Sequence, residues 1–160
     1  LAPVAKLIVK QRYNRFLKWG YINRKGRLVI KYKYDLAFTF SEGYAAVANK
    51  ISHRYSHRHG YINKAGKIIV PLKYIYSRKF SSGVAPVHNG RRWGGINKYG
   101  KIIVPFSLYN PFDYSNRLIR FLKKGKYGYY NKKWKIVIER KFDVAYDFSD
   151  GMAVVGRQVR

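Results

Sequence analysis

Short apolar runs alternate with clusters of glycine, asparagine and basic residues along the whole chain. Four of the runs are triplets of Ile, Val or Leu, and each follows an aromatic or histidine residue, a glycine and a polar turn. One motif therefore occurs four times, as WGYINRKGRLVI, HGYINKAGKIIV, WGGINKYGKIIV and YGYYNKKWKIVI, at residues 19–30, 59–70, 93–104 and 127–138. An internal repeat predicts that its Trp, Tyr and Gly residues serve a recurring structural unit.

The repeat continues past this motif into an aromatic connector and a phrase of the form F-S-x-G. The phrase occurs at residues 40–43, 80–83 and 148–151, and the third repeat has Arg117 in place of its glycine. Cutting the chain after this position gives repeats at residues 1–43, 44–83, 84–117 and 118–151, and a partial fifth repeat at 152–160. The length fits one domain built as a repeat array.

Each repeat is predicted to hold three short strands and an irregular return, because aromatic and β-branched runs bounded by Gly, Asn and Pro are typical of strands. The second strand carries the aromatic–glycine pair, and the third is the apolar triplet. First strands are expected at residues 1–10, 44–51, 84–89 and 118–123. A single meander cannot bury both of its faces, so neighbouring repeats must supply the core. We expect an all-β tandem array of three-stranded antiparallel meanders, as an open solenoid-like stack or, alternatively, with propeller-like closure.

The turns between the second and third strands follow the pattern N-x-x-G. This pattern places Gly26, Gly66 and Gly100 where a tight hairpin needs a positive φ. Trp134 takes that position in the fourth repeat and should distort or lengthen its hairpin. Proline cannot donate to a ladder, so Pro71 and Pro105 are expected to end the third strands that they follow.

The connectors and the last residues complete the predicted architecture. Tyr34, Phe38 and Phe40 of the first connector, with Phe142, Tyr146 and Phe148 as counterparts, are expected to pack between neighbouring sheets. Residues 152–160 are expected to form an edge strand. Either Arg157 and Arg160 keep this strand from pairing with other chains, or it pairs with a neighbour.

This pattern resembles the WG (or KWG) repeat family, a β-rich repeat. The I-N-x-x-G and F-S-x-G phrases and the aromatic–glycine pairs carry the resemblance, which covers essentially the whole chain. His59 and Tyr127 depart from it by replacing Trp. The resemblance implies a fold and no catalytic residues; its signature positions here are Trp19, Gly20, Gly26, Gly60, Gly66, Trp93, Gly94, Gly100 and Gly128.

Charge is the second strong signal. Lys and Arg number 34 against 7 Asp and Glu, which gives a net charge of +27 at pH 7. A magnitude of about 2–8 is enough to keep a small domain soluble. Such an excess repels itself in the compact state unless something anionic neutralises it, so the composition favours a polyanionic partner.

The hairpins between first and second strands carry the candidate binding residues. The two long hairpins contain QRYNRF and HRYSHRH, which offer arginine forks for phosphate oxygens and tyrosine rings for stacking. Basic residues also recur in the N-x-x-G turns, at Arg24, Lys25, Lys64, Lys98, Lys132 and Lys133. The predicted polyanion-binding residues are Arg12, Tyr13, Arg15, Arg54, Tyr55, Arg58, Arg91, Arg92, Lys123, Lys124 and Lys126. No base-reading motif is present, so the predicted binding to nucleic acid or another polyanion has little sequence specificity.

Catalytic and metal chemistry find little support. The chain has no cysteine, and most of its acidic residues recur at equivalent repeat positions, which is typical of turns and local partners for lysines. His53, His57 and His59 fit no standard closed metal site, and nearby arginines disfavour a cation. We therefore expect a non-enzymatic protein without metal or cofactor. No apolar run is long enough for a transmembrane helix.

An alternative role is that of a structural subunit in a larger assembly, such as a filament, coat or virion layer. Copies or other proteins would join it through the edge strand at residues 152–160, and acidic neighbours would absorb the charge.

Overall fold

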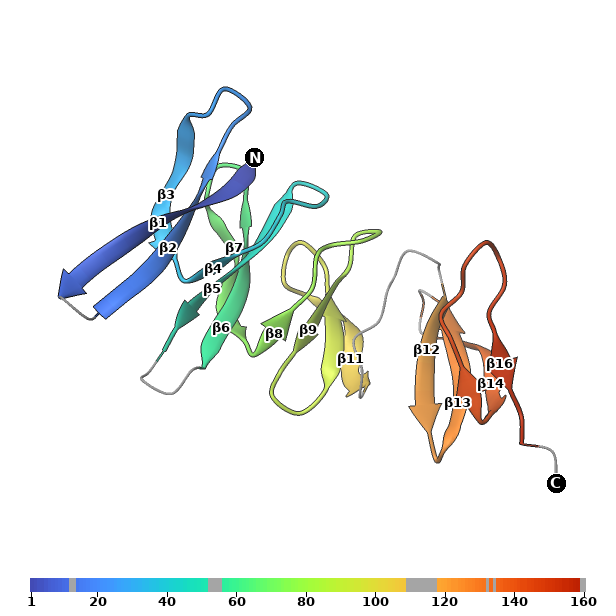
Figure 1. Cartoon of the computed structure of the whole chain (residues 1–160). Coiled ribbons are helices and arrows are strands. Elements are labelled where there is room, and N and C mark those ends of the chain that lie inside the picture. Colours follow the sequence, from blue (N-terminus) through green and yellow to red (C-terminus); the bar gives the residue numbers. More distant parts are fainter. Residues whose placement is uncertain (12–13, 52–55, 109–117, 132, 134, 159–160) are drawn as a thin grey trace.

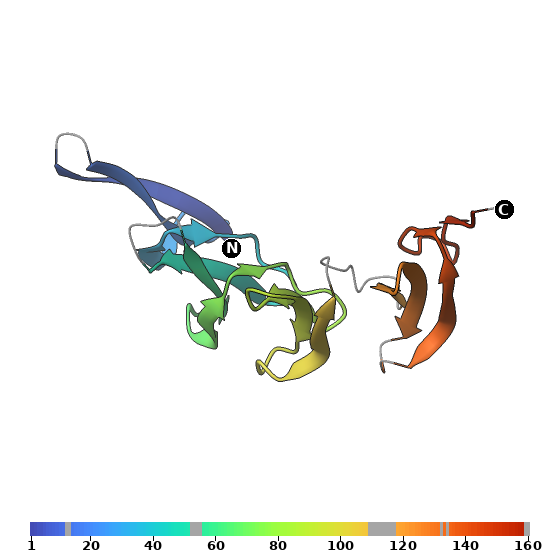
Figure 2. The same ribbon diagram turned by 90° about the horizontal axis from the view of Figure 1, so that it is seen from below.

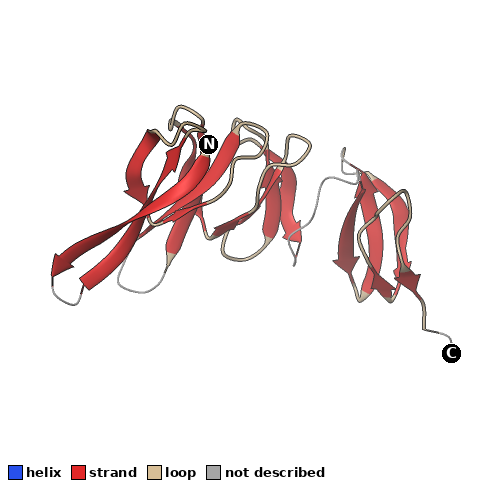
Figure 3. Cartoon of the chain, turned by 45° about the horizontal axis from the view of Figure 1, so that its top comes forward, coloured by secondary structure: helices blue, strands red, loops and turns tan. Residues whose placement is uncertain are grey.

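In the computed structural model the chain forms a row of small antiparallel sheets, with no helix among the residues described (Figures 1 and 3). The structure describes residues 1–11, 14–51, 56–108, 118–131, 133 and 135–158. The sheets follow one another in chain order, and the view from below shows the same succession (Figure 2). No described sheet closes into a barrel. The expected all-β, open tandem array is confirmed.

The sheets contain three, four, four, three and two strands. The first sheet has β1 (Ala2–Gln11), β2 (Asn14–Ile22) and β3 (Leu28–Tyr34). The second has β4 (Leu36–Ala37), β5 (Tyr44–Lys50), β6 (His57–Asn63) and β7 (Ile68–Tyr74). The third has β8 (Tyr76–Ser77), β9 (Ala85–His88), β10 (Trp93–Ile96) and β11 (Ile102–Leu108). The last two have β12 (Leu118–Lys123), β13 (Lys126–Asn131) and β14 (Ile136–Phe142), then β15 (Val144–Ala145) and β16 (Val155–Gly156).

The return between repeats, expected to be irregular, adds a two-residue strand to the sheet of the next repeat. β4 pairs with β5, β8 with β9, and β15 with β16. The F-S-x-G phrase is the turn of this small hairpin: Ser41 and Tyr44 exchange two backbone hydrogen bonds of 2.8 and 3.0 Å. Glu42 and Gly43 between them both have positive φ, as a type I′ turn requires. Main-chain hydrogen bonds therefore tie each of these connectors to the following repeat.

The N-x-x-G turns have the predicted form. In the first repeat the amide of Gly26, at a φ of 74°, donates to the carbonyl of Asn23 at 3.0 Å. The Asn23 side chain accepts from the amides of Lys25 and Arg27. Trp134 lies outside the described residues, but the amide of Asn131 donates to the carbonyl of Lys135 at 2.9 Å, the same span as in the other turns. The hairpin is therefore not lengthened, and the alternative expectation, a distortion at Trp134, falls outside the described residues.

The glycine of each aromatic–glycine pair lies directly under the third strand. A Cβ at Gly60 would be 2.4 Å from the carbonyl oxygen of Val70 and 2.8 Å from that of Pro71. The register shows the cause: His59 pairs with Tyr74 and Tyr61 with Val70, so a step of two residues along β6 matches a step of four along β7. This bulge presses the third strand onto the second, and only glycine leaves the space.

The bulge also corrects one prediction. Pro71 lies inside β7 and Pro105 inside β11, so neither proline ends its strand. Both are in the bulged part of an edge strand, opposite Gly60 and Gly94, where the ladder needs no amide donor.

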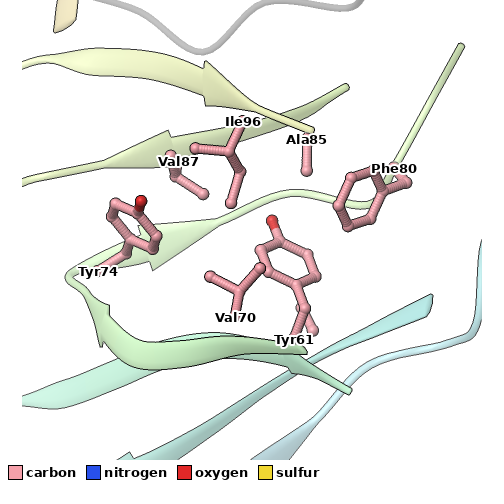
Figure 4. Packing of buried hydrophobic residues seen from close by; sticks show 8 residues of the cluster. Tyr61, Val70, Tyr74, Phe80, Ala85, Val87 and Ile96 are labelled. Carbon is pink, nitrogen blue, oxygen red and sulfur yellow. The ribbon is translucent and has the colours of Figure 1, made fainter. Parts of the chain in front are cut away.

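The core lies at the junctions between repeats. Tyr61, Val70, Tyr74 and Phe80 of the second repeat pack against Val87, Ala85 and Ile96 of the third (Figure 4). Equivalent clusters join the first repeat to the second and the third to the fourth. Stacked repeats thus supply the core, as predicted.

Connector aromatics divide into two groups. The rings of Phe40, Phe80 and Phe148 form T-shaped pairs with those of Tyr21, Tyr61 and Tyr129 at centroid distances of 4.9–5.0 Å. Phe38 and Tyr146 were expected to pack between sheets as well, but they are 43% and 58% exposed. Their carbonyl groups instead accept hydrogen bonds from the Tyr21 and Tyr129 hydroxyls, which fixes the connector with these side chains outward.

His59 fills the position of the motif tryptophan and is 5% exposed. Its Nδ1 is 3.0 Å from the hydroxyl of Ser77 in the next connector strand. Burial, with a smaller effect of the neighbouring His57, lowers the pKa of His59 from 6.5 to about 4. The folded protein therefore holds this ring neutral at physiological pH.

Gly60→Ala is expected to lower the free energy of unfolding by about 3 kcal/mol, since the new methyl group would overlap two backbone carbonyl groups. Urea denaturation measures the loss. Gly26→Ala is the control: nothing lies within 4 Å of its added Cβ, so only the positive φ costs stability, about 1 kcal/mol. Equal losses in both variants would contradict the close-approach explanation.

His59→Tyr, which takes the residue of the equivalent position 127, is expected to flatten the acid limb of the stability profile. In the wild type the unfolded state binds a proton between pH 6.5 and about 4 that the buried ring rejects, so stability falls as pH falls through this window. Urea midpoints across the window test this. An unchanged slope in the variant would show that His59 is not the titrating group.

Candidate polyanion interface

The array has two edges of different construction. The hairpins β1–β2, β5–β6, β9–β10 and β12–β13 end along one edge, which we call the tip edge (Figures 1 and 3). The N-x-x-G and F-S-x-G turns lie along the opposite edge, which we call the turn edge. The alternation of hairpin direction within each meander produces this separation.

Two short hairpins place their predicted binding residues at the tip edge. In β9–β10 the Asn89 side chain accepts from the amides of Arg91 and Arg92 at 2.9 and 3.0 Å, which holds both arginines at the turn. Arg91 is exposed, and the half-buried Arg92 donates to the carbonyl of Arg91 at 2.9 Å. The structure thus brings two arginines together on one hydrogen-bonded turn.

The β12–β13 tip carries three lysines. Lys123 pairs with Lys126 across a turn in which Lys124 and Gly125 both have positive φ. All three lysine side chains are exposed. Lys126 forms an ion pair with Asp143, so Lys123 and Lys124 are the stronger candidates for an outside anion.

The two long hairpins are only partly described. Arg12, Tyr13, Arg54 and Tyr55 lie outside the described residues, and Arg15 is placed by its backbone alone, opposite Val9. Arg58 is half-buried on β6, and its guanidinium makes a 3.4 Å hydrogen bond to the carbonyl of His57. Both hairpins extend towards the tip edge (Figure 1).

Acidic residues at the connectors already have partners within the protein. Asp35 pairs with Lys18 at 2.8 Å and accepts from the amide of Lys50 at 2.9 Å. Burial alone would raise the pKa of Asp35, but these hydrogen bonds outweigh it and lower the pKa below its ordinary value. Asp143 occupies the same place in the fourth repeat, and hydrogen bonds from Lys126 and the Gln158 amide lower its pKa. The predicted pairing of repeated carboxylates with local lysines is confirmed at these two positions.

The turn edge is also basic, as the repeat pattern indicated. Its exposed cations are Arg24, Lys25, Arg27, Lys64, Lys67, Lys98, Lys101, Lys133 and Lys135, while Lys132 lies outside the described residues. Glu42 lies on the same edge, and its carboxylate accepts from the amide of Gly83 at 2.9 Å, which links the turns of the first two repeats. Both edges therefore offer positive charge.

The structure brings together rings that the sequence analysis did not assign to binding. The rings of Phe38, His59, Tyr76, His88 and Trp93 form a continuous line of contacts across three repeats. Arg78 and Lys79 are exposed in the connector that carries Tyr76. Tyr76 takes the position of Leu36 in the first connector and Val144 in the fourth, so a repeat alignment could have marked it as an unusual ring.

No three histidine, cysteine or acidic side chains in the described part of the chain gather closely enough to hold a metal ion; His53 lies outside that part. The same residues contain no helix long and apolar enough to cross a membrane.

Comparison with known families gives one match. The model of the WG containing repeat matches residues 19–50, 60–93 and 127–156. No curated protein and no solved structure matches the chain. The unmatched residues 94–126 include Gly95, where the other repeats carry the tyrosine that bonds the connector. The three matches cover more than half of the sequence, and the chain therefore belongs to the family of WG-containing repeat proteins.

Proposed function

We propose that this protein is a non-enzymatic scaffold whose tip edge binds nucleic acid or another polyanion with little sequence specificity. The observation that carries the proposal is an excess of positive charge that the protein's own acidic residues cannot neutralise. Even if every acidic residue formed an ion pair with a lysine or arginine, a net charge of +27 would remain. Asp35, Asp143 and Asp147 are already engaged in ion pairs with Lys18, Lys126 and Arg120.

The tip edge suits this role better than the turn edge. Its cations include arginines, whose planar guanidinium groups match phosphate oxygens in pairs, whereas lysine predominates on the turn edge. Tight hairpins hold the backbone at Arg91, Arg92, Lys123 and Lys124, so less loop entropy is lost on binding. Regular repetition of the hairpins along the row suits a partner with regularly spaced charges.

The variant Arg12→Ala/Arg15→Ala/Arg54→Ala/Arg58→Ala is expected to bind mixed-sequence duplex DNA more weakly than the wild type. If each arginine contacts one phosphate, the slope of log affinity against log salt falls by about 3 to 4. Fluorescence anisotropy between about 50 and 200 mM salt measures both quantities. The control, Arg24→Ala/Lys25→Ala/Lys64→Ala/Lys98→Ala, removes the same charge from the turn edge and should change the slope less. If both variants change the slope equally, binding depends on net charge alone and not on the tip edge. If the wild type binds neither DNA nor heparin at low salt, the proposal is refuted.

A second candidate function is assembly through the fourth repeat. Ile138 is only half-buried there, whereas the equivalent Ile30, Val70 and Val104 are buried. Val144, Met152 and Val154, in the connector that follows β14, are 49%, 75% and 71% exposed. An apolar surface of this kind is typical of a site that another chain covers.

Under this second candidate, the chain is expected to form concentration-dependent oligomers that persist at high salt, and deletion of residues 152–160 is expected to abolish them. The deletion removes β16, whose Val155 pairs with Ala145. Analytical ultracentrifugation is the measurement. Arg157→Ala/Arg160→Ala is the control, since it removes the charge and keeps the strand. A monomer at all concentrations would exclude assembly of this chain with itself.

A further inference from the structure

A ladder of aromatic rings crosses the first three repeats. Phe38 of the first connector lies 6.0 Å from His59, and His59 lies 6.2 Å from Tyr76 of the second connector, measured between ring centroids. Tyr76 stacks on Trp93 at 6.4 Å with an interplanar angle of 21°, and His88 meets both rings. We call these five residues the ring ladder. At each of the two junctions, an exposed connector ring (Phe38 or Tyr76) lies beside the strand ring at the motif position (His59 or Trp93).

The two connector rings remain open to solvent. Phe38 is 43% and Tyr76 57% exposed, although His59 between them is buried. Tyr76 is held on both sides: its strand β8 pairs with β9, and the neighbouring Ser77 contacts His59 at 3.0 Å. Rings fixed in this way lose little conformational freedom when a planar group stacks on them.

Positive charge flanks the same rings. Arg78 and Lys79 follow Tyr76 after Ser77 and are exposed, and the hairpin of Trp93 carries Arg91 and Arg92. Asp35, which precedes Phe38 in the connector, is held by Lys18 at 2.8 Å. An anion that approaches the ladder therefore meets cations beside aromatic faces.

We propose that the ring ladder is a stacking platform for the bases of a single-stranded nucleic acid. This inference rests on the proposed polyanion binding and names its preferred ligand. Bases have planar faces that stack on Tyr76 and Phe38, while the phosphates between them contact Arg78, Lys79 and Arg91. A duplex hides its base faces, and heparin has none, so both gain only the electrostatic part of the interaction.

The test compares ligands as well as variants. Binding of oligo-dT, a duplex of the same length and heparin is measured by fluorescence anisotropy or competition at fixed salt. Tyr76→Leu removes the ring and keeps an apolar side chain, as Leu36 does at the equivalent position of the first connector. Tyr76→Phe retains the ring. Tyr99→Ala is the matched control, because Tyr99 is 77% exposed beside Lys98 but lies on the turn edge.

Tyr76→Leu is expected to weaken oligo-dT binding by about tenfold, the loss of one stacked base, and to leave duplex and heparin binding unchanged. Tyr76→Phe and Tyr99→Ala should bind all three ligands as the wild type does. Thermal melting confirms that each variant folds. If Tyr76→Leu binds oligo-dT normally while heparin and DNA still bind, the ladder is no platform and the polyanion proposal stands. If the wild type binds none of the three at low salt, both proposals fail together.

Discussion

The structure depends on the contact between the motif glycine and the backbone of the third strand. At Gly20, Gly60 and Gly128 an added Cβ would lie 2.4–2.6 Å from a carbonyl oxygen of that strand. The glycine leaves the space for a bulge that presses the third strand onto the second, and beyond the bulge Tyr34 and Tyr74 pair with the motif positions Trp19 and His59 of their own sheets. The connector then leaves in a fixed direction and reaches the sheet of the next repeat. A local steric requirement thus sets the geometry of the whole row.

A second interaction propagates this geometry from one repeat to the next. The hydroxyl of Tyr61, whose pKa burial raises, stays protonated and donates to the carbonyl of Arg78 at 2.6 Å. Tyr21 and Tyr129 make the same bond to their own connectors. In the third repeat Gly95 takes the place of this tyrosine, and the side chains of Val84 and Val104 fill the space around it. Apolar packing at Val104, Leu108, Ile119 and Phe121 joins that repeat to the fourth.

The sequence predicts the repeats, the all-β array and the N-x-x-G turns because each depends on residues close together in the chain: short apolar runs, Asn side chains and glycines at positive φ. The prediction that Pro71 ends its strand is wrong, because the bulge that accommodates the proline depends on the pairing of two strands and cannot be recognised from the residues around Pro71 alone. The prediction for Phe38 is wrong for a related reason. Whether a connector ring turns inward is decided by the hydrogen bond from Tyr21, which lies 17 residues away. For the proposed binding site, the charge and the positions of the hairpins can be predicted from the sequence. The ring ladder cannot, because its rings come together only when neighbouring repeats stack.

The placement of charge differs between acids and bases in a way that bears on function. Asp35 and Asp143 occupy positions that the fold prescribes, where each accepts a backbone amide and a lysine at the start of a connector. Glu42 likewise joins two turns. Some of the basic residues at the tips also have partners in the fold, as Lys126 has in Asp143. Among the described residues, however, exposed lysines such as Lys64, Lys123 and Lys124 form no ion pair, and mutual repulsion between so many like charges destabilises the compact state. An anionic chain lying along the row, as we propose, would neutralise many of these charges at once and offset the cost of their repulsion.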